Sequence, residues 1–169
     1  MKGERSYRRE SDMYPVVAGW FARTLRGLYP RTRIDTYDTS RVTLNRFLER
    51  EGLHEFFPDF QTYEIQVDVT AVILLRSRLA ALGFVECKLA HISLRDLSQL
   101  LGYSRVALPI YSIIVSPSGI TSGLHYLLNA FGRLDVLEYG DGHRIKVATW
   151  DAVREEVNLP TLIPPGEYK

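Results

Sequence analysis

The chain has 169 residues, the usual size of one globular domain, and its 46% hydrophobic and 24% charged residues exclude a disordered or fibrous protein. No apolar run approaches the roughly 18 to 20 residues that a membrane span needs, and Met1–Glu10 carries charges where a secretion signal is apolar. The single cysteine and four scattered histidines exclude an internal disulfide and give no zinc-binding spacing. We therefore expect a cytoplasmic protein that makes no contact with a membrane.

The charges are unevenly distributed along the chain. Residues 1–35 contain eight Lys or Arg against four Asp or Glu, whereas the net charge of the whole chain is only +1. A basic end can meet phosphate groups, but such a run is more often a solvated, mobile terminus. We expect one domain over 1–169, with a mobile basic N-terminus over 1–11 and an extended, Pro-rich tail over 159–169.

The first half of the chain contains a helical pattern and a strand-like run. Apolar residues recur at helical spacing from Tyr14, and Pro15 suits the first turn because its missing N–H would be unpaired there. Residues 62–75 are rich in β-branched side chains, which favour strands. In chain order we predict a helix from Tyr14 to about Tyr29, a short strand over 33–38, a helix over 40–51, a loop over 53–61, and a long strand or hairpin arm over 62–75.

The second half alternates short strands with helices. Ser93 and Asp96 have the capping-box spacing of a helix start, and Pro109 ends that helix. In chain order we predict a strand over 84–89, this helix over 93–108, a strand over 111–115, a helix over 119–131, and a hairpin of 136–139 with 144–149 around Gly140-Asp141-Gly142. The order predicts a mixed central β-sheet flanked by helices, of the α/β or α+β class, and α/β is the class we expect.

Asp68, Glu86 and Lys88 form the constellation that can carry chemistry. Asp68 lies in the strand-like run, and Glu86 and Lys88 share one face of the next strand because side chains alternate. Two carboxylates on one sheet surface repel each other unless a cation bridges them. Mg²⁺ suits such a place, since it takes oxygen ligands, often one or two carboxylates completed by water and phosphate oxygens. Taken alone, so short a pattern more commonly reflects surface ion pairing.

Neighbouring residues add to this pattern. Gln99 and Tyr103 lie four residues apart on the next helix, so both point the same way and can contact a nucleic-acid backbone or support Lys88. A plain half-exposed helix face is the alternative. Cys87 alternates with Glu86 and Lys88 and so faces the core, where a buried small hydrophobe is expected rather than a nucleophile.

The motifs together resemble the PD-(D/E)XK nuclease superfamily, in the branch of RecB-type nuclease domains and archaeal Holliday junction resolvases. The resemblance rests on Asp68, then Glu86-Cys87-Lys88, then Gln99-Leu100-Leu101-Gly102-Tyr103, and it covers roughly residues 62–115. Each motif is short, so the specificity comes from their order and spacing. The resemblance implies a restriction-endonuclease-like core.

The same resemblance implies a function and a role for each residue. Asp68, Glu86 and the carbonyl of Cys87 would bind Mg²⁺, with Mn²⁺ as a substitute, and Lys88 would orient or polarise the attacking water. Gln99 and Tyr103 would match the family's Gln-X-X-X-Tyr helix. The protein is then expected to be a metal-dependent endonuclease that hydrolyses DNA in repair, recombination or mobile-element biology. A homodimer would suit paired cuts on a two-fold substrate.

The sequence departs from the family pattern at two places. A literal Pro58-Asp59 pair exists, but it falls in the predicted loop, 27 residues before Glu86, so Asp68 is preferred. Many relatives also place an acid on the first helix. Glu10 and Asp12 are the candidates here, and the sequence does not choose between them.

Two other functions compete with a nuclease. Residues 93–105 also resemble the first helix and turn of a helix-turn-helix DNA reader, with Gly102 at the turn. Pro109 follows too soon for a recognition helix, and the strand-like residues 111–115 come next. A nuclease-like fold that binds nucleic acid or protein without catalysis is the other alternative. His125 and His143 have no triad-like partner and are expected to be structural or surface residues.

Overall fold

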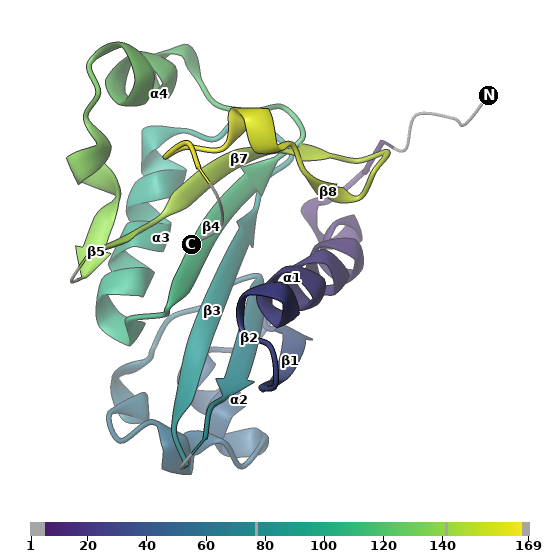
Figure 1. Cartoon of the computed structure of the whole chain (residues 1–169), viewed down its shortest axis with the longest axis vertical. Helices are drawn as coiled ribbons and strands as arrows, with labels where there is room; N and C mark the ends of the chain where they lie inside the picture. Colours follow the sequence, from purple (N-terminus) through teal and green to yellow (C-terminus); the bar gives the residue numbers. More distant parts are fainter. Residues whose placement is uncertain (1–5, 77, 141, 167–169) are drawn as a thin grey trace.

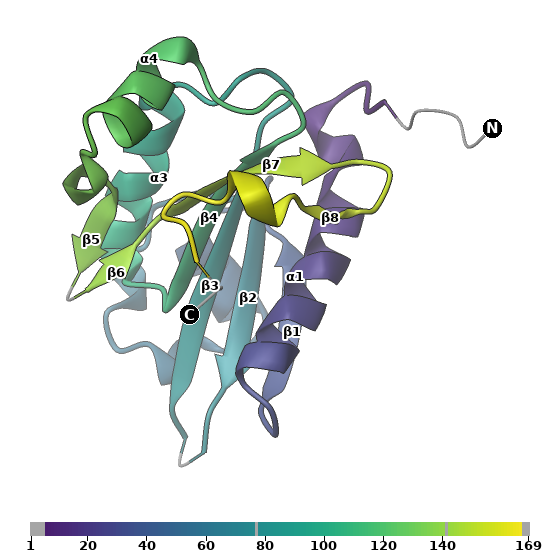
Figure 2. The same cartoon turned by 45° about the horizontal axis from the view of Figure 1, so that its top comes forward.

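The chain folds as an α/β protein with a mixed, curled sheet and helices on both faces (Figure 1, Figure 2). This computed structural model describes residues 6–76, 78–140 and 142–166. The described helices are α1 (Tyr14–Leu28), α2 (Leu44–Arg50), α3 (Leu94–Ala107) and α4 (Ser122–His125). The six-stranded sheet has the order β1-β2-β3-β4-β7-β8, made of Arg33–Asp38, Val69–Leu74, Ala80–Cys87, Tyr111–Ser116, Lys146–Asp151 and Glu156–Val157, and β5 (Glu138–Gly140) pairs with β6 (His143–Arg144) separately.

Strand direction changes across the sheet. The strands β1, β2 and β3 pair antiparallel, whereas β3, β4 and β7 pair parallel. The crossover from β3 to β4 contains α3, and the connection from β4 to β7 contains α4 and the β5–β6 pair. The predicted α/β class with a mixed, helix-flanked sheet is confirmed. No helix in the described part of the chain combines the length and apolar character needed to cross a membrane.

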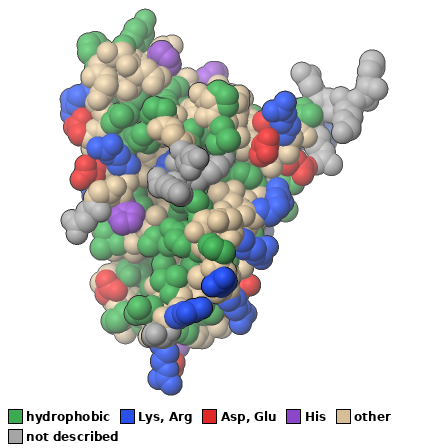
Figure 3. Space-filling model, viewed as in Figure 1, with side chains coloured by type: hydrophobic (Ala, Val, Ile, Leu, Met, Phe, Trp, Pro, Cys, Tyr) green, Lys and Arg blue, Asp and Glu red, His purple; other side chains and the backbone are tan. Residues whose placement is uncertain are grey.

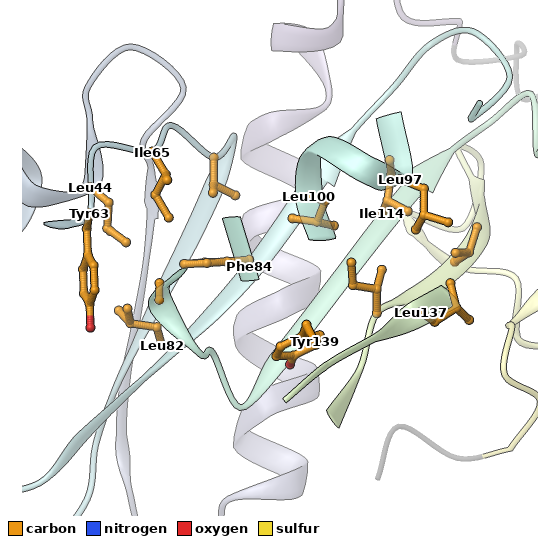
Figure 4. Close-up of a cluster of buried hydrophobic side chains, with 14 of the residues drawn as sticks. Leu44, Tyr63, Ile65, Leu82, Phe84, Leu97, Leu100, Ile114, Leu137 and Tyr139 are labelled. Atoms are coloured by element: carbon orange, nitrogen blue, oxygen red, sulfur yellow. The ribbon is translucent and has the colours of Figure 1, made fainter. Parts of the chain in front are cut away.

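Side-chain alternation along β3 divides the core into two layers. Leu82 and Phe84 point into the same core layer as Leu97 and Leu100 of α3, with Phe84 on the side toward Leu100 and Leu82 on the side toward Tyr63 (Figure 4). Val85 and Cys87 point to the opposite face, which α1 covers. The predicted alternation of this strand is therefore confirmed, and it places Glu86 on the α3 face, at the end of an otherwise apolar row.

The second layer is built around aromatic rings of α1. Trp20 stacks on Phe21 and meets Trp150 of β7 edge to face, with ring centroids 5.6 Å apart in the second pair. Phe21 lies so close to β3 that a Cβ atom added at Gly83 would come within 2.8 Å of the ring. Burial of these large rings fixes α1 across β2 and β3, and so fixes where its N-terminus lies.

The prediction of one strand over 62–75 is wrong in its first half. Tyr63, Ile65 and Val67 are buried at every second position, which is the pattern that suggested a strand. Their segment instead serves α2, because the carbonyls of Ile65 and Tyr63 accept the Leu44 and Asn45 N–H groups of its first turn. Regular pairing begins only at Val69, so Asp68 lies immediately before β2 rather than inside a strand.

Other element boundaries also differ from the sequence prediction. The strand predicted over 84–89 begins at Ala80 and ends at Cys87, and the helix predicted from residue 40 begins at Leu44. The helix predicted over 119–131 is a short α4 that continues as a π-helical turn over Tyr126–Ala130. The predicted hairpin is split: its first arm pairs only with β6, while β7 pairs parallel with β4 because it completes the main sheet.

The two ends of the chain pack against β7. Residues 1–5 and 167–169 lie outside the described part, but Trp150 Nε1 donates a hydrogen bond to the Tyr7 hydroxyl at 3.0 Å. Glu10–Asp12 then forms a 3₁₀ turn that leads into α1. Near the other end, Ile163 exchanges backbone hydrogen bonds with Val147 of β7.

Candidate active site

The site predicted from the sequence is assembled where β2 begins and β3 ends. Antiparallel pairing aligns Val69 with Val85, so Asp68, one residue earlier, lies beside Glu86, one residue later. The Cys87 N–H donates a hydrogen bond to Asp68 Oδ2 at 2.8 Å. The sheet register thus brings Asp68 next to Glu86 and Cys87, which lie 18 and 19 positions later in the sequence. The sequence predicted that Asp68 and Glu86 share this surface.

Glu86 is a buried carboxylate with one oxygen left over. Its side chain is only 6% exposed, and Oε1 accepts a hydrogen bond from Lys88 Nζ at 3.1 Å. Oε2 is buried and accepts no hydrogen bond from any described residue, and the Asp68 N–H, which also faces the carboxylate, only partly offsets the effect of burial on its pKa. Burial, reinforced by the nearby Asp68 carboxylate, raises the pKa of Glu86 to about 7. Burying a carboxylate oxygen in this way costs free energy unless a ligand that is not part of the chain binds to it.

Lys88 provides the positive charge of this cluster. Burial lowers the pKa of Lys88, but the Glu86 carboxylate more than offsets that effect and the net direction is upward. The lysine therefore stays charged at neutral pH. One ammonium group faces two carboxylates, so an additional cation fits the local charge.

Two residues at the start of α1 complete the cluster. Tyr14 donates a hydrogen bond from its hydroxyl to the Asp68 carboxylate, which stabilises the charged form while burial raises the pKa of Asp68. Glu10 lies close enough that its charge affects the pKa values of Asp68 and Lys88. Tyr14 was missed in the sequence analysis, although Glu10 and Tyr14 share the four-residue spacing that places two side chains on one helix face.

The structure separates the acids that the sequence left open. Asp12 Oδ2 accepts the backbone N–H groups of Arg8 and Arg9, and the Arg9 N–H in particular lowers the pKa of Asp12. Asp12 therefore closes the turn before α1, whereas Glu10 faces the cluster. Asp59 of the Pro-Asp pair accepts a hydrogen bond from the Tyr63 hydroxyl, at the edge of the loop that supports α2.

Cys87 contributes backbone rather than thiol chemistry. Its side chain is fully buried in the α1 layer, and burial raises the pKa of the thiol. The expectation of a buried small hydrophobe is confirmed. Its N–H holds Asp68, and its carbonyl remains the predicted third metal ligand.

Gln99 and Tyr103 lie on one exposed face of α3. Their side chains hydrogen-bond to each other, with Gln99 Nε2 3.2 Å from the Tyr103 hydroxyl. Asp96 lies one turn earlier on α3, and its carboxylate accepts hydrogen bonds from the Ser93 N–H and hydroxyl. The Lys88 charge also contributes to the pKa of Asp96. The Gln99 and Tyr103 pair lies on the same helix as Asp96, one to two turns further along, and its role in the site stays a prediction.

The helix-turn-helix alternative is wrong at its turn. The helix α3 runs without a break from Leu94 to Ala107, straight through Gly102. The predicted capping box is present, with Ser93 and Asp96 bonded to each other at the N-terminus. The chain leaves the helix through Leu108 in a left-handed conformation and enters β4, because Pro109 cannot continue a helix.

The donor set fits Mg²⁺ better than a metal that is held wholly by protein. No group of three or more His, Cys, Asp and Glu side chains in the described residues forms a metal-binding cluster by itself. Mg²⁺ needs fewer protein ligands, because it keeps several waters and is commonly bound through one or two carboxylates. The unpartnered Glu86 Oε2 beside Asp68 is the observation that fits such an ion.

The fold and the site define an α/β protein with a mixed six-stranded sheet and a half-buried carboxylate-lysine cluster at the end of β3. No family model, no curated protein and no solved structure matches this chain.

Proposed function

We propose that this protein is a Mg²⁺-dependent DNA endonuclease of the PD-(D/E)XK type, with a restriction-endonuclease-like core. The observation that carries the proposal is the Glu86 carboxylate, buried beside Asp68 with one oxygen bonded to Lys88 and the other unpartnered. An ion pair with a purely structural role gains nothing from a carboxylate oxygen that is buried without a hydrogen-bond donor from the described residues, whereas a metal ion would use that oxygen. Mn²⁺ is the expected substitute ion.

Each residue of the cluster has a distinct task in this proposal. Asp68 and Glu86, with the Cys87 carbonyl, would hold the ion. When bound, the ion would supply positive charge at the scissile phosphate and acidify a water molecule. Lys88 is positioned to orient the attacking water or to stabilise negative charge on the phosphate. Tyr14 and the Cys87 N–H fix the Asp68 carboxylate, so that it meets the ion without reorganisation.

The biological setting that we propose is DNA repair, recombination or mobile-element biology, with DNA as the partner. Arg23 and Arg26 of α1 are exposed, and Lys and Arg side chains gather along α1 and the turn after it (Figure 3). Such a basic surface, which runs along α1 away from the cluster, suits a phosphate backbone. A homodimer would allow paired cuts on a two-fold substrate.

The deciding experiment compares cleavage by the wild type with cleavage by Glu86→Gln. Labelled duplex, single-stranded, flap and four-way-junction DNA would be incubated with Mg²⁺, with Mn²⁺ or with EDTA. We expect metal-dependent cutting by the wild type and a loss of at least about a hundredfold in Glu86→Gln. Glu64→Gln is the matched control, because Glu64 is exposed and its substitution removes the same charge at another place.

The same experiment can overturn the proposal. Cutting by Glu86→Gln at the wild-type rate would exclude this site. If the wild type binds DNA but cuts none of the substrates with either metal, the function is binding without catalysis, and RNA substrates would be tested next.

A further inference from the structure

A cavity with cationic side chains in its lining lies at the C-terminal end of α1, away from the carboxylate-lysine cluster. The cavity has a volume of about 470 Å³ and lies between the C-terminal end of α1, the start of β4 and β7, and the β5–β6 pair. Its polar and aromatic lining consists of Tyr29, Tyr111, Tyr139, His143, Arg144 and Lys146. No Asp or Glu is among the lining residues in the described part of the chain. The cavity is therefore positively charged and large enough for a small organic ligand.

Lys146 is the unusual group in this cavity. Its ammonium lies 5.2 Å from the centroid of the Tyr111 ring, and the side chain makes neither a salt bridge nor a hydrogen bond with any described residue. Burial lowers the pKa of Lys146. A half-buried cation that has a ring beneath it and no carboxylate of the described residues beside it is stabilised by an anion that enters the cavity.

The other lining residues restrict what that anion can be. Arg144 is exposed at the rim, opposite Glu138 in the β5–β6 register, and its charge also reaches Asp135. Tyr139 is buried and its hydroxyl donates to the Pro109 carbonyl at 2.7 Å, so Tyr139 forms the back wall of the cavity. The half-buried Tyr29 ring and the exposed His143 ring are the aromatic surfaces that a ligand can reach. The cavity thus joins a phosphate-binding pair of cations to aromatic surfaces on which a flat base can stack.

We propose that this cavity binds a nucleotide through a terminal phosphate, with the phosphate at Lys146 and Arg144 and the base against the Tyr29 and His143 rings. Inorganic phosphate would use only the cations and leave most of the volume empty. A nucleotide uses both halves of the cavity. The nucleotide is either free or the phosphorylated end of a nucleic-acid strand, since both carry the same chemistry.

If the ligand is a strand end, the structure sets the distance between that end and the carboxylate cluster. This consequence alone rests on the proposed function. The 15 residues of α1 separate the cavity from the Glu10 and Tyr14 end of the helix by about 22 Å. At about 3.4 Å per nucleotide, a strand held in the cavity would reach the carboxylate cluster roughly six nucleotides from its end. Arg23 and Arg26 are exposed on α1 between the two places.

The test is a binding measurement in EDTA, where no cleavage occurs. Calorimetric titrations would compare 5′-AMP, adenosine and inorganic phosphate. We expect 5′-AMP to bind about tenfold or more tightly than either of the others, because only it uses both the cations and the rings. Equal affinity for 5′-AMP and adenosine would overturn the proposal.

Charge-removing variants identify the site. Lys146→Met keeps the aliphatic stem over Tyr111 and removes the charge, and we expect it to weaken 5′-AMP binding about tenfold while adenosine binding is unchanged. Arg144→Gln should act in the same direction, and because Arg144 is exposed it tests the site even if Lys146→Met does not fold. Arg50→Gln on α2 is the control and should bind as the wild type does. Wild-type affinity in a folded Lys146→Met or in Arg144→Gln would refute the site.

Oligonucleotides with and without a terminal 5′-phosphate distinguish the two sources of ligand. A preference for the phosphorylated strand that disappears in Arg144→Gln identifies a strand end, whereas 5′-AMP binding without such a preference identifies a free nucleotide. Either result supports the cavity. The Glu86→Gln variant should bind 5′-AMP normally, so a failure of this proposal and a failure of the nuclease proposal give different results.

Discussion

Glu86 combines burial, a neighbouring carboxylate and a single lysine, and this combination makes stability depend on pH. Its pKa in the folded protein, about 7, lies above its ordinary value, so the folded state binds the proton more tightly than the unfolded state does. The stability that this group contributes is fully present below about pH 4.5 and is lost as the pH rises through about 7.

We expect the wild type without metal to lose on the order of 2 kcal/mol relative to Glu86→Gln between pH 4.5 and pH 8. Urea unfolding of both proteins in EDTA at several pH values measures this difference. Because the ion binds the deprotonated carboxylate, Mg²⁺ should restore wild-type stability at pH 8 and have little effect at pH 5. A difference between the two proteins that is constant with pH would contradict the burial of a titrating Glu86.

Tyr14 is a positioning residue for Asp68. Tyr14→Phe removes one hydrogen bond to the charged carboxylate and leaves the ring in the α1 layer, so we expect a loss of about 1 kcal/mol in stability. We also expect the Mg²⁺ concentration that gives half-maximal cleavage to rise about tenfold, which a titration with the metal measures. Tyr126→Phe is the control, because Tyr126 is 61% exposed. An unchanged metal titration would remove Tyr14 from the site.

At the residue level, the sequence was informative where the chemistry depends on short spacing. Glu86 and Lys88 could be placed on one face of a strand by alternation alone, and Asp68 followed from the strand beside it. Glu10 and Tyr14 reach the cluster only because aromatic packing of α1 fixes its N-terminus beside β2 and β3. That contact spans more than fifty residues of sequence, and no local pattern encodes it.

Among the elements, α3 bears on the helix-turn-helix reading that the sequence allowed, because that reading needs a turn at Gly102. Gly102 lies inside this continuous helix, is exposed, and has no atom within 4 Å of the place where a Cβ would be added. We therefore expect Gly102→Ala to stabilise the protein by about 0.5 to 1 kcal/mol, because alanine loses less backbone entropy in a helix. Thermal or urea unfolding measures the effect. A destabilised Gly102→Ala would mean that the chain turns at this position.

The elements also show why periodicity succeeded for α3 and misled over 62–75. A capping box, an apolar face and Pro109 all specify the same helix, so local signals agreed. In the second case, burial at every second residue is real, but the partner is the first turn of α2 rather than a strand. Alternation shows which side chains are buried, but it does not show which segment forms hydrogen bonds with the backbone of those residues.

Across the whole molecule, α1 connects two chemically different places. Its N-terminal end meets the carboxylate-lysine cluster, and its C-terminal end meets the cationic cavity. Composition could not predict this arrangement, because a net charge of +1 averages the two regions. The basic excess of residues 1–35 was visible, and the structure shows that part of it lies along α1 rather than only in a terminal tail (Figure 3).

The hydrogen bond between Tyr7 and Trp150 has a consequence for the order in which the protein folds. Trp150 also packs against Trp20, so the first helix is held by a residue 130 positions later in the sequence. Glu10 lies between Tyr7 and α1 along the chain, so the short segment that carries it is anchored on both sides once β7 is in place. Contacts of such high sequence separation close long loops, and we therefore expect the carboxylate cluster to take its final form late in folding, after β7 joins the sheet.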